Sequence, residues 1–172
     1  HLPVEEEGRL NDARIRENFV ERIFAYRRLK GLFRPRWTLG DVVVFHTREK
    51  LLLRAHDERG YRELGRLVAD AKNIPRAAFA DDSADRFMEI MTRPATVAKH
   101  VNVLQHMLAF LRWADDDVGR VEMHDAIGDY RAGLVPLVVP ITLVQHLARR
   151  HDQQLLLESS YLAPHPKELM LR

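Results

Sequence analysis

The sequence predicts an all-α, single compact domain of about seven or eight helices in an orthogonal or bundle-like arrangement. Apolar residues recur three or four positions apart in successive segments, as on one face of a helix. Residues that cap or stop helices stand between these segments, and no two alternating segments are joined by a tight turn. A length of 172 residues with 46% hydrophobic residues fits one domain with its own core.

The expected helices are bounded by capping side chains, prolines and glycines. In chain order they run from Asn11 or Asp12 to about Lys30, from Leu39 behind Thr38 to about Ala55, from Asp57 to the stop at Asn73–Pro75, over a short stretch after Ser83, from Pro94 to about Trp113, from the Asp115–Asp117 loop and cap to Ala132, from Pro140 to about Arg150, and over Gln153–Ser159. Leu134–Val139 is expected to be extended, because a proline disfavours helix in the residue before it.

Two of these helices carry informative apolar patterns. The helix that starts at Leu39 has Val42 and Phe45 on one side and Val44 and Leu51 on the other, which is typical of a central element. The helix that starts at Pro94 carries a single stripe, formed by Val97, Val101, Leu104, Leu108 and Leu111.

Residues 1–12 read as an interdomain linker, and residues 13–172 as the helical domain. The opening HLPVEEEGRLND is acidic, contains a proline and a glycine, and begins without Met. We therefore expect the chain to be part of a longer protein, cut near the junction with a preceding domain.

Several functional classes find no support in the residues. The chain has no cysteine, so it can hold neither a disulfide nor a cysteine-ligated cluster. It has neither a glycine-rich phosphate loop nor a nucleophile elbow, so no catalytic residue is assigned. His46 and His56 lie ten positions apart, about 15 Å along a helix, and no metal site is expected there. The most apolar segment, Val135–Leu147, is too short and too interrupted to span a membrane.

The basic residues are mostly arginine. Of 27 basic residues 5 are Lys and 22 are Arg, although the net charge is only +2. Arginine binds phosphate in two parallel hydrogen bonds and stacks on bases, but a GC-rich genome also enriches it. A run with interleaved aromatic residues concentrates these cations, in the pattern of a phosphate-binding surface. The run contains Arg22, Arg27, Arg28, Lys30, Arg34 and Arg36. The alternative is a helix end whose cations complement the helix dipole above a core of aromatic residues.

Two further polar groups are candidates for nucleic-acid binding. His46, Arg48, Lys50 and Arg54 form a polar seam on the second helix. The seam is either an ion-pair network with Glu49, Asp41 and Glu63 or an anion-facing groove. Lys99, Asn102, His106 and Trp113 lie opposite the apolar stripe of the fifth helix, a mixture that suits base or phosphate recognition. The alternative for this face is a solvated or packed surface.

Six ordered segments resemble one family along nearly the whole chain. They are FVERIFAYRRLK (19–30), FHTREKLLLRAH (45–56), YRELGRLVA (61–69), RPATVAKHVNVLQH (93–106), YRAGLVPLVVPITLVQH (130–146) and YLAPHPKELMLR (161–172). The family is the YbgA-type helical domain of unknown function, found at the C-terminus of two-domain proteins. Its preceding domain resembles iron–sulfur thiouracil desulfidases with cysteine ligands, so the resemblance implies a parent enzyme that desulfurates 4-thiouridine in tRNA.

The resemblance implies a role in substrate delivery for this chain. The domain is expected to bind RNA, in particular tRNA, and to present the thiolated base to an iron–sulfur domain in cis, in the cytoplasm. No cofactor and no membrane contact are expected in the domain itself. The alternative is a structural or interaction domain that supports its neighbour or forms dimers. In that case the arginines would pair internally with Asp and Glu, leaving no continuous basic face.

Overall fold

The computed structural model describes residues 2–111, 117–169 and 171, which form eight α-helices and three short 3₁₀ helices without any strand. The helices are η1 (Glu7–Asn11), α1 (Ala13–Leu32), α2 (Leu39–His56), α3 (Glu58–Ala69), η2 (Ala71–Asn73), α4 (Arg76–Met91), α5 (Val97–Leu108), α6 (Asp117–Ala132), α7 (Val138–Arg150), α8 (Gln154–Leu157) and η3 (Lys167–Leu169). The predicted all-α class and helix number are confirmed. No helix within the described residues has the length and apolar character needed to cross a membrane.

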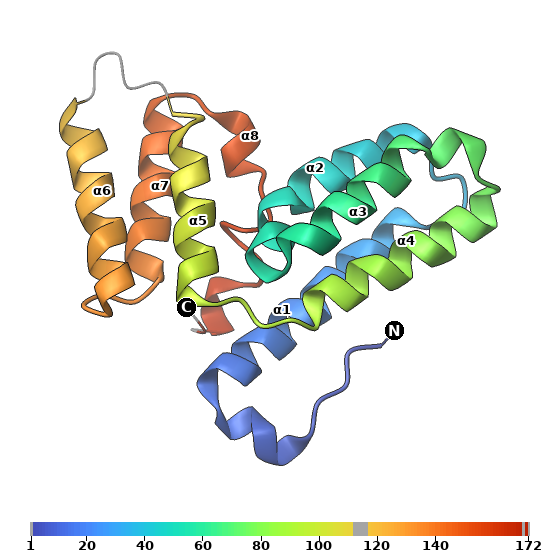
Figure 1. Ribbon diagram of the computed structural model, residues 1–172, viewed down its shortest axis with the longest axis horizontal. Helices are drawn as coiled ribbons and strands as arrows, with labels where there is room; N and C mark the ends of the chain where they lie inside the picture. Colours follow the sequence, from blue (N-terminus) through green and yellow to red (C-terminus); the bar gives the residue numbers. More distant parts are fainter. Residues whose placement is uncertain (1, 112–116, 170, 172) are drawn as a thin grey trace.

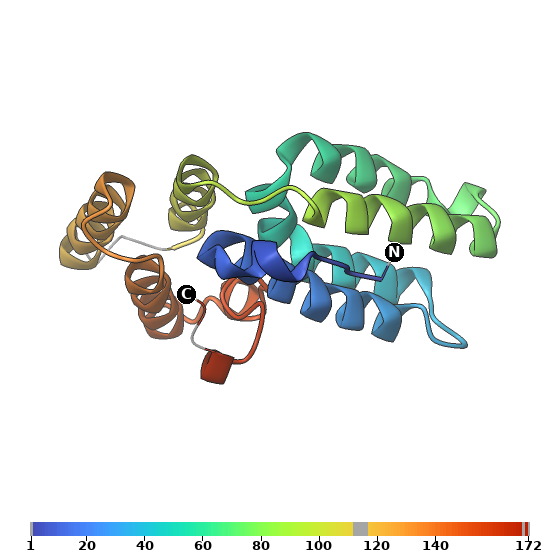
Figure 2. The same cartoon turned by 90° about the horizontal axis from the view of Figure 1, so that it is seen from below.

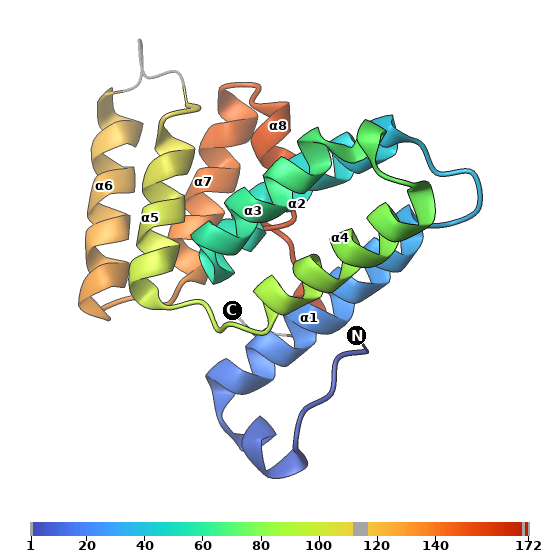
Figure 3. The ribbon, with the colours of Figure 1, turned by 45° about the vertical axis from the view of Figure 1, so that its right-hand side comes forward.

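The helices form two groups (Figure 1). Helices α1 to α4 lie together in one group, and α5, α6 and α7 stand side by side in the other, as a second view confirms (Figure 3). The groups meet where α2 packs against α5. Seen from below, the connection from α4 to α5 runs from the first helix group to the second (Figure 2). One apolar core extends through both groups, while a smaller cluster around Val42, Ala71 and Phe79 is confined to the first.

Three predicted N-caps are confirmed in atomic detail. The Asp12 carboxylate accepts hydrogen bonds from the N–H groups of Arg14 and Ile15 at 2.8 and 3.1 Å. Thr38 and Asp41 form a reciprocal capping box, and Asp57 accepts from the N–H of Arg59. These contacts satisfy donors that lack a partner in the first helical turn, which explains why the starts of these helices are readable from the sequence.

The fourth helix begins at Arg76, so the prediction that it follows Ser83 is wrong. Pro75 occupies its N-cap, where the missing proline N–H costs no helical hydrogen bond. Ser83 is a buried residue in the middle of α4. Phe79 is fully buried and anchors the first turns, which otherwise carry few large apolar side chains.

Two boundaries in the second group also differ from the predictions. Helix α5 ends at Leu108, where the next N–H groups turn to acceptors three residues back, and does not reach Trp113. Residues 112–116, including Trp113 and most of the expected Asp115–Asp117 cap, lie outside the described residues. The prediction that Leu134–Val139 is extended is wrong: the chain turns here, Leu137 already has helical dihedral angles, and α7 begins at Val138. Pro140 stands in the first turn of α7, where proline is tolerated.

Helix α2 is central only in its second half. Leu51, Leu52 and Leu53 are buried on successive positions, so this half is surrounded by protein. In the first half Val43 and Val44 are 55% and 52% exposed, so the prediction that α2 is apolar and covered on two sides is wrong there. The apolar stripe of α5 is buried except for Val97, which is 44% exposed.

Residues 2–12 lie against the first helix. Pro3 is buried, and the Glu5 carboxylate pairs with Arg9 at 2.7 Å and with Arg22 at 3.7 Å. Helix η1 contacts α1. The assignment of this segment as an interdomain linker stays a prediction.

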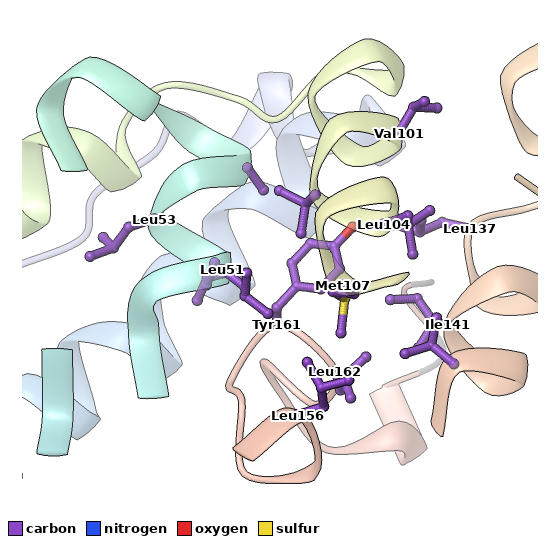
Figure 4. Close-up of a cluster of buried hydrophobic side chains, with 14 of the residues drawn as sticks. Leu51, Leu53, Val101, Leu104, Met107, Leu137, Ile141, Leu156, Tyr161 and Leu162 are labelled. Atoms are coloured by element: carbon purple, nitrogen blue, oxygen red, sulfur yellow. The ribbon is translucent and has the colours of Figure 1, made fainter. Parts of the chain in front are cut away.

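The segment after α8 returns between the two helix groups. Its Tyr161 is fully buried, with Leu51 of α2 on one side and Leu104 and Met107 of α5 on the other (Figure 4). The Tyr161 hydroxyl lies 2.9 Å from Nδ1 of His100. The backbone N–H of Ser160 donates to the carbonyl of Arg48 at 3.0 Å. The segment therefore fills the junction and ties α2 to α5.

A buried carboxylate holds this segment and two helices together. Glu49 of α2 is 1% exposed and accepts a bidentate pair from Arg28 of α1, with Nε–Oε1 at 2.6 Å and Nη2–Oε2 at 3.0 Å. Ser160 donates its hydroxyl to Glu49 at 2.7 Å, and Arg28 also donates to the carbonyl of Pro164 at 2.9 Å. Such a carboxylate is stable in the interior only because each of these partners is present.

We expect Arg28→Met to lower the free energy of unfolding by about 3–5 kcal/mol, because it strands the buried Glu49 carboxylate. Arg48→Met is the matched control, since the Arg48–Glu158 pair at 3.1 Å is 52% exposed on both sides. An exposed pair of this kind contributes less than about 1 kcal/mol. Urea denaturation of both variants measures the difference, and equal losses would contradict the structural role of Arg28.

Candidate functional site

Four of the predicted RNA-binding cations lie at one exposed end of the first helix group. Arg27, Lys30 and Arg34 follow each other at intervals of three and four residues along α1 and just past its end, and Arg36 lies in the next loop. All four are exposed, and none of them forms an ion pair with another residue in the described part of the chain. Arg36 has a positive φ of 73°, which turns the loop sharply before α2.

Arg76 adds a fifth cation to this surface. Its guanidinium group lies 4.1 Å from the centre of the Trp37 ring, and it donates a hydrogen bond to the Trp37 carbonyl oxygen. Trp37 in turn packs edge-on against Phe33. We call Arg27, Lys30, Arg34, Arg36 and Arg76 the basic end. The sequence analysis missed Arg76 because it lies 39 positions after the tryptophan it covers.

A shallow hollow of about 370 Å³ opens beside the basic end. The half-buried rings of Tyr26, Phe33 and Trp37 form part of its wall, and Lys30 stands at its edge. Asp81 and Asp85 of α4 line the other side. The alternative prediction placed these aromatic residues in the core. Each of them does pack against the core, but each is only partly buried and also borders solvent.

Three other arginines from the predicted set have internal partners. Arg22 pairs with Glu5, and Arg28 makes the bidentate pair with Glu49. Arg48 pairs with Glu158 at the surface. The expected ion-pair network of the α2 seam exists with different acids, since Arg54 pairs with Glu58 at 2.6 Å instead of with Asp41 or Glu63. A role of these arginines in RNA binding stays a prediction.

The histidines of the two predicted polar groups come together in one seam between α2, α3 and α5. His46 stacks on Tyr61 with ring centres 5.3 Å apart, and His106 meets Phe110 edge-on at 5.2 Å. The Lys50 ammonium lies 5.8 Å from the centre of the same Phe110 ring. His46, Lys50 and His106 are half-buried, and the Nε2 atoms of both histidines are buried without a hydrogen-bond partner among the described residues.

Lys99 and Asn102, the other two predicted binding residues on α5, have different surroundings. The Lys99 ammonium donates to the carbonyl of His56 at 2.5 Å, so it stabilises the C-terminal end of α2, where the helix dipole favours a cation. Asn102 is exposed to solvent. Trp113, predicted on the same face, lies outside the described residues.

His56 belongs to a polar pocket that the sequence analysis did not foresee. The pocket has a volume of about 300 Å³ and lies between the start of α1, the end of α2, α5 and the turn after α6. Its polar wall is formed by Arg14, Glu17, Asn18, Glu21, His56, His100 and Tyr130. Each family-like segment except Tyr61–Ala69 contributes at least one lining residue, so the family resemblance was the signal that could have pointed to the pocket.

A buried acid–base pair forms part of this wall. His56 and Glu21 are 1% and 3% exposed, and His56 Nε2 lies 3.2 Å from Glu21 Oε2. His56 Nδ1 lies 2.7 Å from the carbonyl oxygen of Arg93, which can only accept a hydrogen bond. Nδ1 therefore carries the proton of this hydrogen bond. His46 and His56 have different surroundings and do not converge on one ion.

These features define an all-α domain with one basic end and one buried polar pocket. The chain belongs to the family described as "Protein of unknown function (DUF1722)", whose profile matches residues 50–166. It is 29% identical over 164 residues to "Uncharacterized protein YbgA" of Escherichia coli (strain K12), covering 95% of this chain and 97% of that protein. That relative therefore consists almost entirely of this helical domain. No solved structure matches the chain.

The seam histidines make stability depend on pH in a defined direction. Burial lowers the pKa of His46, and the nearby Lys50 lowers it further. Burial also lowers the pKa of His106, with added contributions from Arg54 and Lys50 and a smaller opposing one from Glu58. An unfolded histidine takes up its proton near pH 6.5, before the folded one does. Their stabilising effect is therefore present above about pH 6.5 and is lost as the pH falls through the folded-state pKa.

We expect His46→Phe to weaken this pH dependence, because phenylalanine keeps an aromatic ring against Tyr61 but cannot take up a proton. Urea denaturation of wild type and variant at several values between about pH 7.5 and 5 measures it. The wild-type free energy of unfolding should fall more steeply on acidification than that of the variant. Parallel curves would contradict a neutral, buried His46.

Proposed function

We propose that this domain binds RNA through the basic end. The observation that supports the proposal is a group of five exposed arginine and lysine side chains without acidic partners among the described residues, one of which, Arg76, lies over the Trp37 ring. Cations free of internal ion pairs neutralise phosphates with little loss of existing contacts, and binding releases the counterions of the nucleic acid.

Unpaired nucleotides suit this surface better than a uniform duplex. The hollow beside Lys30 presents aromatic rings whose exposed parts offer stacking for bases, and the guanidinium of Arg76 adds a planar cation to the same group. Stacking is tolerant of sequence, so the domain would select accessible loops or ends.

In a parent protein of the two-domain type, the same surface would hold thiolated tRNA for an iron–sulfur desulfidase domain in cis. The support is the family resemblance together with the absence of cysteine from this chain, which leaves the cluster and its chemistry to another domain. The domain would then contribute affinity and position, acting in the cytoplasm where tRNA is found.

A pair of charge-reversal variants tests RNA binding. We expect Arg27→Glu/Arg34→Glu to reduce the affinity for bulk tRNA by at least about 10-fold at low salt and to reduce the slope of log affinity against log salt by about 1 for each lost phosphate contact. Arg66→Glu/Arg149→Glu is the matched control, with the same change in net charge at exposed positions on α3 and α7. Arg28 is left intact because its loss would destabilise the fold.

Two outcomes would overturn the proposal. The first is no tRNA binding by the wild type at low salt, and the second is an affinity that stays flat between low and moderate salt. Equal losses in the test and control variants would show that only net charge matters and would remove the basic end from the proposal.

An interaction domain is the second candidate, favoured by one observation. Leu39, Val43 and Val44 are exposed apolar residues on the first half of α2. If this face mediates self-association, Val43→Glu should convert a dimer to a monomer in analytical ultracentrifugation. A wild-type chain that is monomeric at all concentrations would contradict dimer formation.

A further inference from the structure

We propose that Glu17, Glu21 and His165 bind a divalent transition-metal ion at the wall of the polar pocket. The two glutamates lie one turn apart on α1, and His165 comes from the segment that returns between the helix groups after α8. One potential ligand atom from each of the three residues lies within 4.8 Å of the other two. This site is separate from the basic end and goes beyond RNA binding.

His165 provides the observation that points to a ligand. Its side chain is 9% exposed, and its Nε2 is buried with no hydrogen-bond partner among the described residues. A buried polar atom without a partner is costly, so such atoms are rare unless they serve a ligand. The other ring nitrogen, Nδ1, lies 3.1 Å from the carbonyl oxygen of Pro166. A carbonyl accepts the Nδ1 proton, which leaves the lone pair on Nε2, as in histidines that bind metals.

The spacing of the three groups requires only a small contraction. Nitrogen and carboxylate oxygen ligands stand about 2.0–2.2 Å from a zinc ion, which places tetrahedral ligand atoms roughly 3.4 Å apart. Rotation of the Glu17 and Glu21 side chains can bring the ligand atoms from within 4.8 Å to this spacing without moving the backbone of α1.

The residues around the proposed site orient the Glu21 carboxylate and leave space for a further ligand of the ion. Glu21 is held by His56, 3.2 Å away, and His56 is held by the carbonyl of Arg93. Hydrogen-bonded partners behind a ligand of this kind fix its geometry and strengthen binding. Glu17 and Glu21 both line the pocket of about 300 Å³. Three protein ligands beside such a space leave a coordination position for water or a small molecule, as in catalytic rather than structural sites.

The ligand set indicates the class of ion. Two carboxylates balance the charge of a divalent cation, and one imidazole favours zinc, iron or another first-row transition metal over magnesium or calcium. The chain has no cysteine, so its side chains can offer the ion no thiolate ligand. We therefore take Zn²⁺ as the probe. Mg²⁺ is the competing ion for comparison, because it prefers oxygen ligands alone.

The test is equilibrium dialysis of the chelator-treated full chain against Zn²⁺, with bound metal measured by elemental analysis. We expect one Zn²⁺ per chain and a rise in Tm, because an ion that binds only the folded state stabilises it. His165→Ala and Glu17→Gln should each weaken Zn²⁺ binding by at least about 100-fold, more than the loss of an outer hydrogen-bond partner does. Glu17 is half-buried, so its neutral variant also tests the site if His165→Ala unfolds.

His124→Ala is the matched control, since it removes an exposed histidine of α6 that does not line the pocket. It should leave stoichiometry and affinity unchanged. The assignment is overturned if the wild type binds less than one Zn²⁺, if His165→Ala and Glu17→Gln bind as the wild type does, or if Mg²⁺ competes as well as Zn²⁺. The basic-end variant Arg27→Glu/Arg34→Glu should keep Zn²⁺ binding, so failure of either proposal is recognised separately.

Discussion

The buried carboxylate of Glu49 is the constraint on which the rest of the structure depends. A charged group with 1% exposure is stable only with hydrogen bonds from several sides, and here they come from α1 through Arg28 and from the returning C-terminal segment through Ser160. Satisfying this one group therefore sets where α1, α2 and the last segment lie relative to one another. Tyr161, the neighbour of Ser160, is thereby placed in the junction between the two helix groups.

The position of the last segment decides the polar pocket as well. Once Tyr161 lies against α5, its hydroxyl meets His100, and His165 follows four residues later beside the glutamates of α1. The pocket is thus assembled from parts of the chain that are far apart in sequence. The basic end lies where α1 ends, whereas the pocket lies near where α1 starts. A single helix therefore carries two chemically distinct surfaces, one suited to polyanions and one suited to a cation.

Neighbouring arginines show why the binding surface could be predicted only in part. Arg27 and Arg28 are adjacent, so they point about 100° apart on the helix. Arg27 faces solvent, whereas Arg28 faces a carboxylate 21 positions later in the chain. Both are equally basic in the sequence, and periodicity did not identify Glu49 as the buried partner. For the same reason the clustering of cations between Arg22 and Arg36 was visible, but its division into internal and exposed members was not.

The amino-acid sequence by itself determined the all-α class, the caps at Asp12, Thr38 and Asp57, and the concentration of arginine near the end of the first helix. These features depend on local hydrogen bonds and on helical periodicity, which act over a few residues. Only the tertiary structure decided which cations stay exposed, and only it brings His56 and His165 next to Glu21. Such contacts join residues from three distant segments, and they form because burial leaves each polar group few partners to choose from.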